Sequence, residues 1–182
     1  MALQTMIEKL NTARREYNAQ LAEIAKGGQK EIGAFLGPLI PPGYALKWKQ
    51  YTPYFNDGDA CTFSVHEPYL SKVGEEDEDD DEDRTLDQAI DRYGDPDRQE
   101  SYQTNDYSAA AWRPDGKYPQ KTVTYVVRGF PAIDGYDKTA LEKLRDAWDS
   151  LPEDVLKGAF GDHVACQVLA DGTASVDEYS HD

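Results

Sequence analysis

Apolar residues recur at steps of three and four near the start of the chain. The residues that keep this spacing are Leu3, Ile7, Leu10, Tyr17, Leu21 and Ile24. The pattern predicts an amphipathic helix over residues 3–25, which Gly27–Gly28 is expected to end. A shorter helix is predicted over residues 29–36, with Ile32, Phe35 and Leu36 facing inward.

The first helix also contains a heptad spacing of Leu3, Leu10, Tyr17 and Ile24. The heptad covers few repeats, and Arg14 interrupts its apolar seam. The spacing is therefore weak support for a coiled coil. We therefore expect the helix to dock on the domain's own core in preference to self-association.

Alternation of apolar and polar residues then predicts a hairpin. Residues 45–51 place Leu46 and Trp48 on one face, and residues 61–65 place Cys61, Phe63 and Val65 inward. The intervening Asn56–Asp57–Gly58 tolerates the positive φ of a tight turn.

The second half of the chain alternates strand and helix patterns. Residues 122–130 are predicted as a strand, and Asp137 as the cap of a helix whose buried stripe is Leu141, Leu144, Trp148 and Leu151. A further helix should run from Glu153 to Gly161 with Val155, Leu156 and Phe160 inward. Residues 163–169 and 173–176 flank Asp171–Gly172, which predicts a second hairpin.

The element order predicts an α+β fold, with a mostly antiparallel sheet packed by N-terminal and C-terminal helices. Residues 1–182 form one domain in this interpretation, and residues 71–120 form an acidic, loop-rich insertion within it. Inside the insertion, Thr85 is predicted to cap a short helix that ends at Gly94. We expect Leu86, Ile90, Tyr107 and Trp112 to tether the insertion to the domain.

Charge changes this picture most at residues 75–83, which read EEDEDDDED. Unpaired carboxylates are costly to bury, so this run must face water or a cationic partner. The chain carries a net charge of −16, which opposes direct binding to nucleic acid or to an anionic membrane.

Hydrophobic residues make up 39% of the chain, enough to build a core. The first residues lack the apolar run of a signal peptide and the chain has no run of about 20 apolar residues, so we expect no signal peptide and a cytoplasmic location.

Catalytic and metal-binding signals are absent from the sequence. The histidines (His66, His163 and His181) lack zinc-site spacing, and Cys61 and Cys166 are predicted as small core residues. The segment FNDGD has the wrong periodicity for a calcium loop, which leaves a turn as the interpretation. We therefore predict neither a catalytic residue, a metal ligand nor a cofactor.

The leading functional hypothesis is a non-enzymatic, acidic interaction protein that binds a basic surface of another protein. It would act as a nucleic-acid mimic, for example a phage-encoded inhibitor of a host DNA- or RNA-handling factor. The predicted partner-binding residues are Glu75, Glu76, Asp77, Glu78, Asp79, Asp80, Asp81, Glu82, Asp83, Asp87, Asp91, Tyr107 and Trp112. The last two supply aromatic anchors of the kind interfaces favour.

The segment from Trp48 to Val65 carries a resemblance. Its pattern YFNDG-D-x-C-x-F-x-V resembles that of a group of small bacterial and phage proteins. The resemblance covers about a tenth of the chain, transfers no functional residue, and implies a bacterial or phage origin, with the host cytoplasm as the location if the protein is phage-encoded.

Two alternative functions stay open. The first is a structural or scaffold subunit of a larger assembly, in which the helix over residues 3–24 supplies a homo-oligomer contact. The second is a small enzyme with a dispersed site on the first hairpin. Alternation would place the residues of that site on one face: Lys47, Lys49, Tyr51, Thr62, Ser64 and His66.

Overall fold

A computed structural model describes residues 2–54, 60–74, 85–107 and 118–179. Its helices are α1 (Ala2–Leu36), the 3-10 turn η1 (Gly37–Leu39), α2 (Leu86–Asp91), α3 (Lys138–Asp149) and α4 (Glu153–Phe160). Its strands are β1 (Tyr44–Tyr51), β2 (Ser64–Val65), β3 (Tyr69–Lys72), β4 (Arg98–Asn105), β5 (Gln120–Val127), β6 (Val164–Leu169) and β7 (Ala174–Glu178). This confirms the predicted α+β class.

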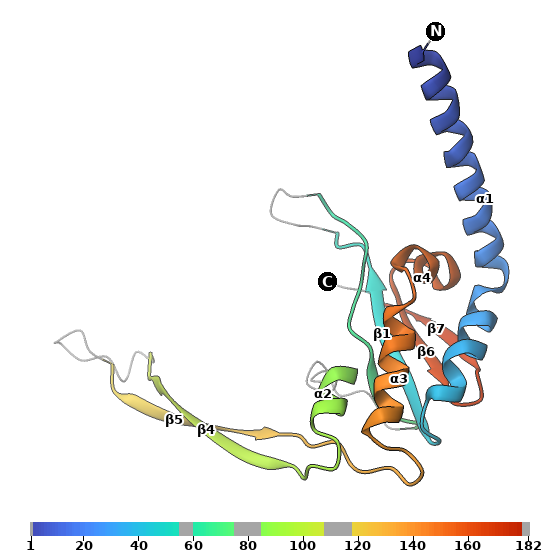
Figure 1. Cartoon of the computed structure of the whole chain (residues 1–182). Coiled ribbons are helices and arrows are strands. Elements are labelled where there is room, and N and C mark those ends of the chain that lie inside the picture. Colours follow the sequence, from blue (N-terminus) through green and yellow to red (C-terminus); the bar gives the residue numbers. More distant parts are fainter. Residues whose placement is uncertain (1, 55–59, 75–84, 108–117, 180–182) are drawn as a thin grey trace.

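The body of the protein is a five-stranded antiparallel sheet covered by helices (Figure 1). Strand β1 lies at its centre, pairing with β6 on one side and with β2 and β3 on the other, while β7 extends the sheet beyond β6. The inward residue Trp48 packs edge-on against Trp148 of α3 and Phe160 of α4, with ring centroids 4.9 Å apart in both pairs. The predicted second hairpin is confirmed as β6–β7, with Gly172 at a positive φ of 84°.

Helix α1 is continuous over its 35 residues, so the predicted break at Gly27–Gly28 is wrong. Glycine inside a helix costs only about 1 kcal/mol relative to alanine, which tertiary packing outweighs. Such packing is present on the C-terminal side, where Ile32 and Leu36 are buried in the core. Phe35, predicted to face inward, is instead exposed.

The N-terminal half of α1 projects away from the body (Figure 1). The contact with α4 includes a hydrogen bond from the Tyr17 hydroxyl to the Asp154 carboxylate. Leu3, Ile7 and Leu10, which precede that contact, are 67%, 49% and 63% exposed. The prediction that this helix docks on the domain's own core is therefore wrong for residues 3–10.

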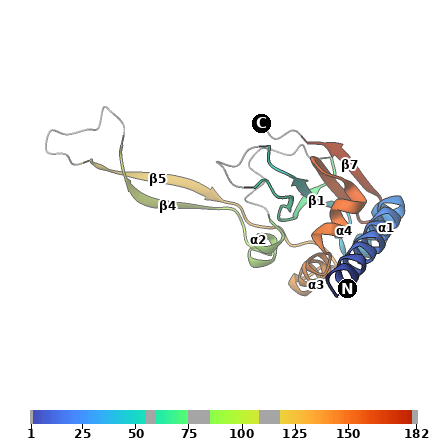
Figure 2. The same cartoon turned by 90° about the horizontal axis from the view of Figure 1, so that it is seen from above.

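The insertion over residues 71–120 contains more regular structure than its sequence predicts. Within this loop-rich insertion, residues 98–105 form β4, which pairs with β5 along eight residues as a separate two-stranded ribbon. Figures 1 and 2 both show this ribbon extending away from the body. The acidic run 75–83 and Trp112 lie outside the described residues.

The short helix α2 begins and ends as predicted. Thr85 accepts a hydrogen bond from the backbone N–H of Gln88, and the Gln88 side chain accepts one from the Thr85 N–H, which makes a reciprocal capping box. Gly94 follows with a φ of 81°. Leu86 and Ile90 are buried, so these two tethers of the insertion are confirmed.

The foot of the ribbon is fixed to α2. The N–H of Gly94 donates to the carbonyl of Phe130 at 2.7 Å, and the N–H of Gly129 donates to the Asp97 carboxylate at 2.8 Å. A pocket at this junction is lined by apolar side chains and by the charged residues Lys72, Arg92, Asp97 and Arg128. Arg92 donates to the Arg128 carbonyl at 3.2 Å, so part of this polar lining also holds the ribbon in place.

Candidate functional site

The predicted partner-binding residues do not form one surface in the described part of the chain. Asp87 and Asp91 are exposed on α2, and Asp87 lies 3.5 Å from the Arg145 guanidinium of α3. Tyr107 lies two residues beyond the end of β4, so it is separated from α2 by the length of the ribbon. It is 68% exposed and packs against Tyr118, with ring centroids 4.9 Å apart.

The outer face of the first hairpin carries a cluster of aromatic rings. Tyr51 stacks on His66 at a centroid distance of 4.6 Å, and its ring lies 5.5 Å from that of Tyr179. The Lys49 ammonium lies 5.0 Å above the Tyr179 ring. Six side chains of the first hairpin were predicted to share this face, and three of them (Lys49, Tyr51 and His66) contact one another or Tyr179 there. The aromatic rings pack against one another. This arrangement is typical of a small cluster that stabilises the surface of the sheet.

The first hairpin is shorter than predicted on its second strand. Pairing with β1 is limited to Ser64 and Val65, and Cys61 is exposed. The expectation that Cys61 is a core residue is therefore wrong, because the chain joins the sheet only three residues later. Cys166 is buried as predicted, and burial raises the pKa of its thiol to about 12, so this thiol is unreactive at neutral pH.

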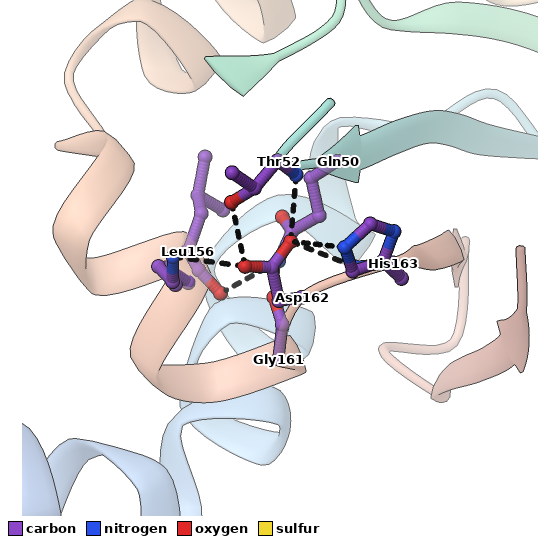
Figure 3. A network of polar contacts seen from close by, with 7 residues as sticks. Gln50, Thr52, Leu156, Gly161, Asp162 and His163 are labelled. Carbon is purple, nitrogen blue, oxygen red and sulfur yellow. Dashed lines mark hydrogen bonds and ion pairs between the residues drawn. The ribbon is translucent and has the colours of Figure 1, made fainter. Parts of the chain in front are cut away.

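A polar network joins the end of β1 to the end of α4 (Figure 3). Gln50 is fully buried; its amide donates to the carbonyl oxygens of Leu156 (3.3 Å) and Gly161 (2.6 Å), and its oxygen accepts from the Trp48 indole at 3.0 Å. The neighbouring Asp162 carboxylate accepts from the Thr52 N–H and hydroxyl, both at 2.8 Å. This network fixes α4 against the sheet.

Both carboxylate oxygens of Asp162 accept hydrogen bonds from groups that hold the fold together. Besides Thr52, the carboxylate meets the Lys157 ammonium at 3.0 Å and accepts from the His163 backbone N–H at 2.9 Å. Burial alone would raise the pKa of Asp162, but the bonds from Thr52 and Lys157 outweigh it and lower the pKa to about 2. A carboxylate held in this way stabilises the fold and is a poor proton acceptor at neutral pH.

Replacing this carboxylate should change the pH dependence of stability. Because the pKa of Asp162 is lower folded than unfolded, its stabilisation is present above about pH 4 and is lost as the pH falls toward 2. We expect Asp162→Asn to lower the free energy of unfolding at neutral pH by about 1 to 2 kcal/mol, a value reduced for partial solvent screening. The difference from the parent should vanish near pH 2.

Urea unfolding across a pH series measures this effect. Asp134→Asn is the matched control, because Asp134 is an exposed residue of the turn before α3. A loss in Asp162→Asn that is the same at pH 7 and pH 2 would show that the carboxylate's charge is not what stabilises the junction.

Two surfaces project from the body, and the sequence patterns predicted neither projection. They are the first half of α1 and the β4–β5 ribbon, which together expose Leu3, Met6, Ile7, Leu10, Tyr102, Tyr125 and Val126. A signal for the ribbon was present: Pro114–Asp115–Gly116, a typical turn sequence, is followed by residues 120–127, which are rich in Thr and Val, and preceded by residues 98–105, which include Tyr102 and Thr104.

Comparison with protein families, curated proteins and solved structures finds no match to this chain. Within the described ranges, the helices lack an apolar stretch long enough to cross a bilayer. Those same ranges hold no group of three or more His, Cys, Asp or Glu side chains placed to bind a metal ion.

Proposed function

We propose that this protein is a structural subunit that self-associates through the helical arm, defined here as residues 2–16 of α1. The observation that carries this proposal is the exposure of an apolar stripe on a helix that projects from the body (Figure 1). Monomeric proteins rarely expose a contiguous apolar surface of this kind without a binding role. A second copy of the chain presents the same stripe and so supplies a complementary partner.

The stripe has the register of a two-stranded coiled coil. Leu3, Ile7 and Leu10 follow steps of four and three, with Ile7 at the position where a β-branched residue favours dimers. Arg14 takes the next seam position and sets the end of the apolar part. The residues flanking the seam, Gln4, Met6, Asn11 and Ala13, are all uncharged.

The arm is pre-formed, which makes a short contact effective. Isolated helices of about 15 residues are marginal in water because nucleation is costly. Here the C-terminal half of α1 is anchored by Ile32 and Leu36, so the arm extends a helix that already exists. Covering the exposed part of these three side chains in both copies, on average about 60% of each, contributes about 5 to 11 kcal/mol, against an association cost of about 4 to 15 kcal/mol.

The charge distribution supports a contact at the arm and opposes one at the body. Residues 1–26 contain four basic and three acidic residues, a net charge of +1 in a chain of −16. Two acidic bodies repel each other, so copies approach most easily where this repulsion is weakest. The arm is such a place.

The charge-mimic function stays a separate prediction. Of the predicted partner-binding residues, the structure describes Asp87 and Asp91 on the surface of α2 and Tyr107 beyond the end of β4, while residues 75–83 and Trp112 lie outside the described residues. The enzyme alternative on the first hairpin likewise stays a prediction.

A salt series on the purified protein tests the proposal. We expect a molar mass of at least twice 20.4 kDa, with the associated fraction rising as salt increases. Raising the ionic strength from 0.01 M to 1 M shortens the Debye length from about 30 Å to about 3 Å, which removes repulsion between bodies but leaves the apolar contact intact. Light scattering after size exclusion measures this. A mass of 20.4 kDa at every salt concentration would rule the function out.

A further inference from the structure

The β4–β5 ribbon has two faces of different chemistry. Directly opposed residues of an antiparallel pair share a face. One face, called here the tyrosine face, carries Arg98, Glu100, Tyr102, Thr104, Lys121, Val123, Tyr125 and Val127. The other, called here the amide-hydroxyl face, carries Gln99, Ser101, Gln103, Asn105, Gln120, Thr122, Thr124 and Val126.

The tyrosine face has the composition of an interface. Tyr102 and Tyr125 are 54% and 44% exposed and meet edge to face, with ring centroids 6.0 Å apart. Tyrosine is enriched at the energetic centres of protein interfaces. On the ribbon these rings stand away from the core of the body, so covering them requires another molecule or another copy.

The polar groups on the tyrosine face are already bonded to one another. The Tyr125 hydroxyl donates to Glu100 at 3.0 Å, and the Arg98 guanidinium donates to the same carboxylate at 2.8 Å. These bonds lower the pKa of Glu100, the bond from Arg98 being the larger cause. Polar groups that are satisfied before contact lower the desolvation cost of being covered.

The ribbon is also close to neutral. Residues 98–127 contain four basic and three acidic residues, a net charge of +1. The rest of the chain, without the ribbon and without residues 1–26, therefore holds 11 of the 19 basic and 29 of the 35 acidic residues. Its net charge is −18. A neutral face attracts neither a strongly basic nor a strongly acidic partner, but it lets two copies of an acidic chain approach.

We propose that the tyrosine face packs against the tyrosine face of a second copy. A face that carries one acidic and two basic side chains among apolar residues can oppose itself about a two-fold axis, as an isologous contact requires. Two-stranded ribbons are marginal in water, and packing one sheet on another supplies the missing burial.

The area of the tyrosine face determines how strong this contact is. Eight residues at about 3.3 Å each and two strands about 4.8 Å apart give roughly 260 Å² per copy. A stable interface buries about 800 Å² per partner, so this contact is weak alone and needs particles that carry more than one ribbon. It therefore rests on the proposed function, in which the helical arm first brings two copies together.

A subunit with two separate self-complementary contacts can bind two other copies. Such subunits form assemblies larger than a dimer. The helical arm and the ribbon leave the body in different directions (Figures 1 and 2). A pair joined at the arms thus still presents two ribbons to further pairs. The expected behaviour is growth from a dimer to larger species as protein concentration rises.

Sedimentation velocity over a range of protein concentrations tests this with matched variants. Val123→Glu puts a charge on the tyrosine face, and Thr124→Glu puts the same charge on the amide-hydroxyl face one residue later. We expect Val123→Glu to lose the species larger than the dimer and Thr124→Glu to retain them. Tyr102→Thr keeps a strand-forming residue but removes one ring, and should also reduce the larger species.

The outcomes separate the two proposals. A parent protein that forms a dimer without larger species, or a Val123→Glu protein that assembles like the parent, overturns the ribbon contact and leaves the helical arm intact. Equal loss of the larger species in Val123→Glu and Thr124→Glu also overturns it, because the effect would then not belong to one face. A parent that stays monomeric overturns the proposed function itself.

Discussion

Gly33→Ala is expected to destabilise the protein by about 2 to 3 kcal/mol, toward the upper end of the effect of overpacking a core. A Cβ atom at this position would lie 2.1 Å from the carbonyl oxygen of Gly172 and 3.1 Å from its carbonyl carbon. Both are backbone atoms of the β6–β7 turn, and Gly172 itself has a φ of 84°, so the turn has little freedom to move aside. Helix α1 and the sheet would have to separate.

Gly27→Ala is the matched control in the same helix. A Cβ atom there meets nothing within 4 Å, so only the helix propensity changes. We expect this variant to gain about 0.5 to 1 kcal/mol, because alanine restricts the unfolded chain and favours the helix.

Urea unfolding followed by tryptophan fluorescence and circular dichroism measures both variants. If Gly33→Ala were as stable as Gly27→Ala, the close approach of α1 to the β6–β7 turn would be refuted.

Elements with one buried face were predictable from sequence. In α3, Leu141, Leu144 and Trp148 are buried and Asp137 caps the helix by accepting from the Ala140 N–H at 2.9 Å, as predicted. The stripe and the cap are both local signals, and each agrees with the tertiary packing. Helix α2 and the β6–β7 hairpin were predictable for the same reason.

The two glycine positions near the end of α1 show where local signals fail. Gly27–Gly28 has the composition of a helix stop, but whether a helix stops there depends on what packs beyond it. The packing partner is the turn at Gly172, which lies far away in sequence. Sequence periodicity contains no information on that contact.

Strand β4 was missed because it has no buried face, whereas its partner β5 overlaps the strand predicted at residues 122–130. Periodicity reports which side of an element contacts a core, and residues 98–105 are mostly exposed on both sides. The helical arm differs, because its apolar stripe was predictable from the sequence. The sequence did not reveal that the body of the protein leaves this stripe uncovered. In both cases the missing information is the direction in which the element leaves the body.

The second large effect is expected from the helical arm, where removing the stripe should abolish self-association. Leu3→Gln, Ile7→Gln and Leu10→Gln together replace the apolar residues with a good helix former and keep the net charge at −16. Without apolar burial, little remains to offset the cost of association.

The control is a triple change on the polar face of the arm. Glu8→Gln, Thr12→Gln and Arg15→Gln remove one acidic and one basic residue, so the net charge is again unchanged. All three positions are exposed and lie off the seam. This variant should associate as the parent does.

Light scattering on the parent and the two triple variants, at the same protein concentration and at high salt, is the most direct test of the assembly function. We expect 20.4 kDa for the stripe variant and at least twice that mass for the parent and the polar-face variant. A stripe variant that keeps the mass of an associated parent would contradict a contact through the helical arm.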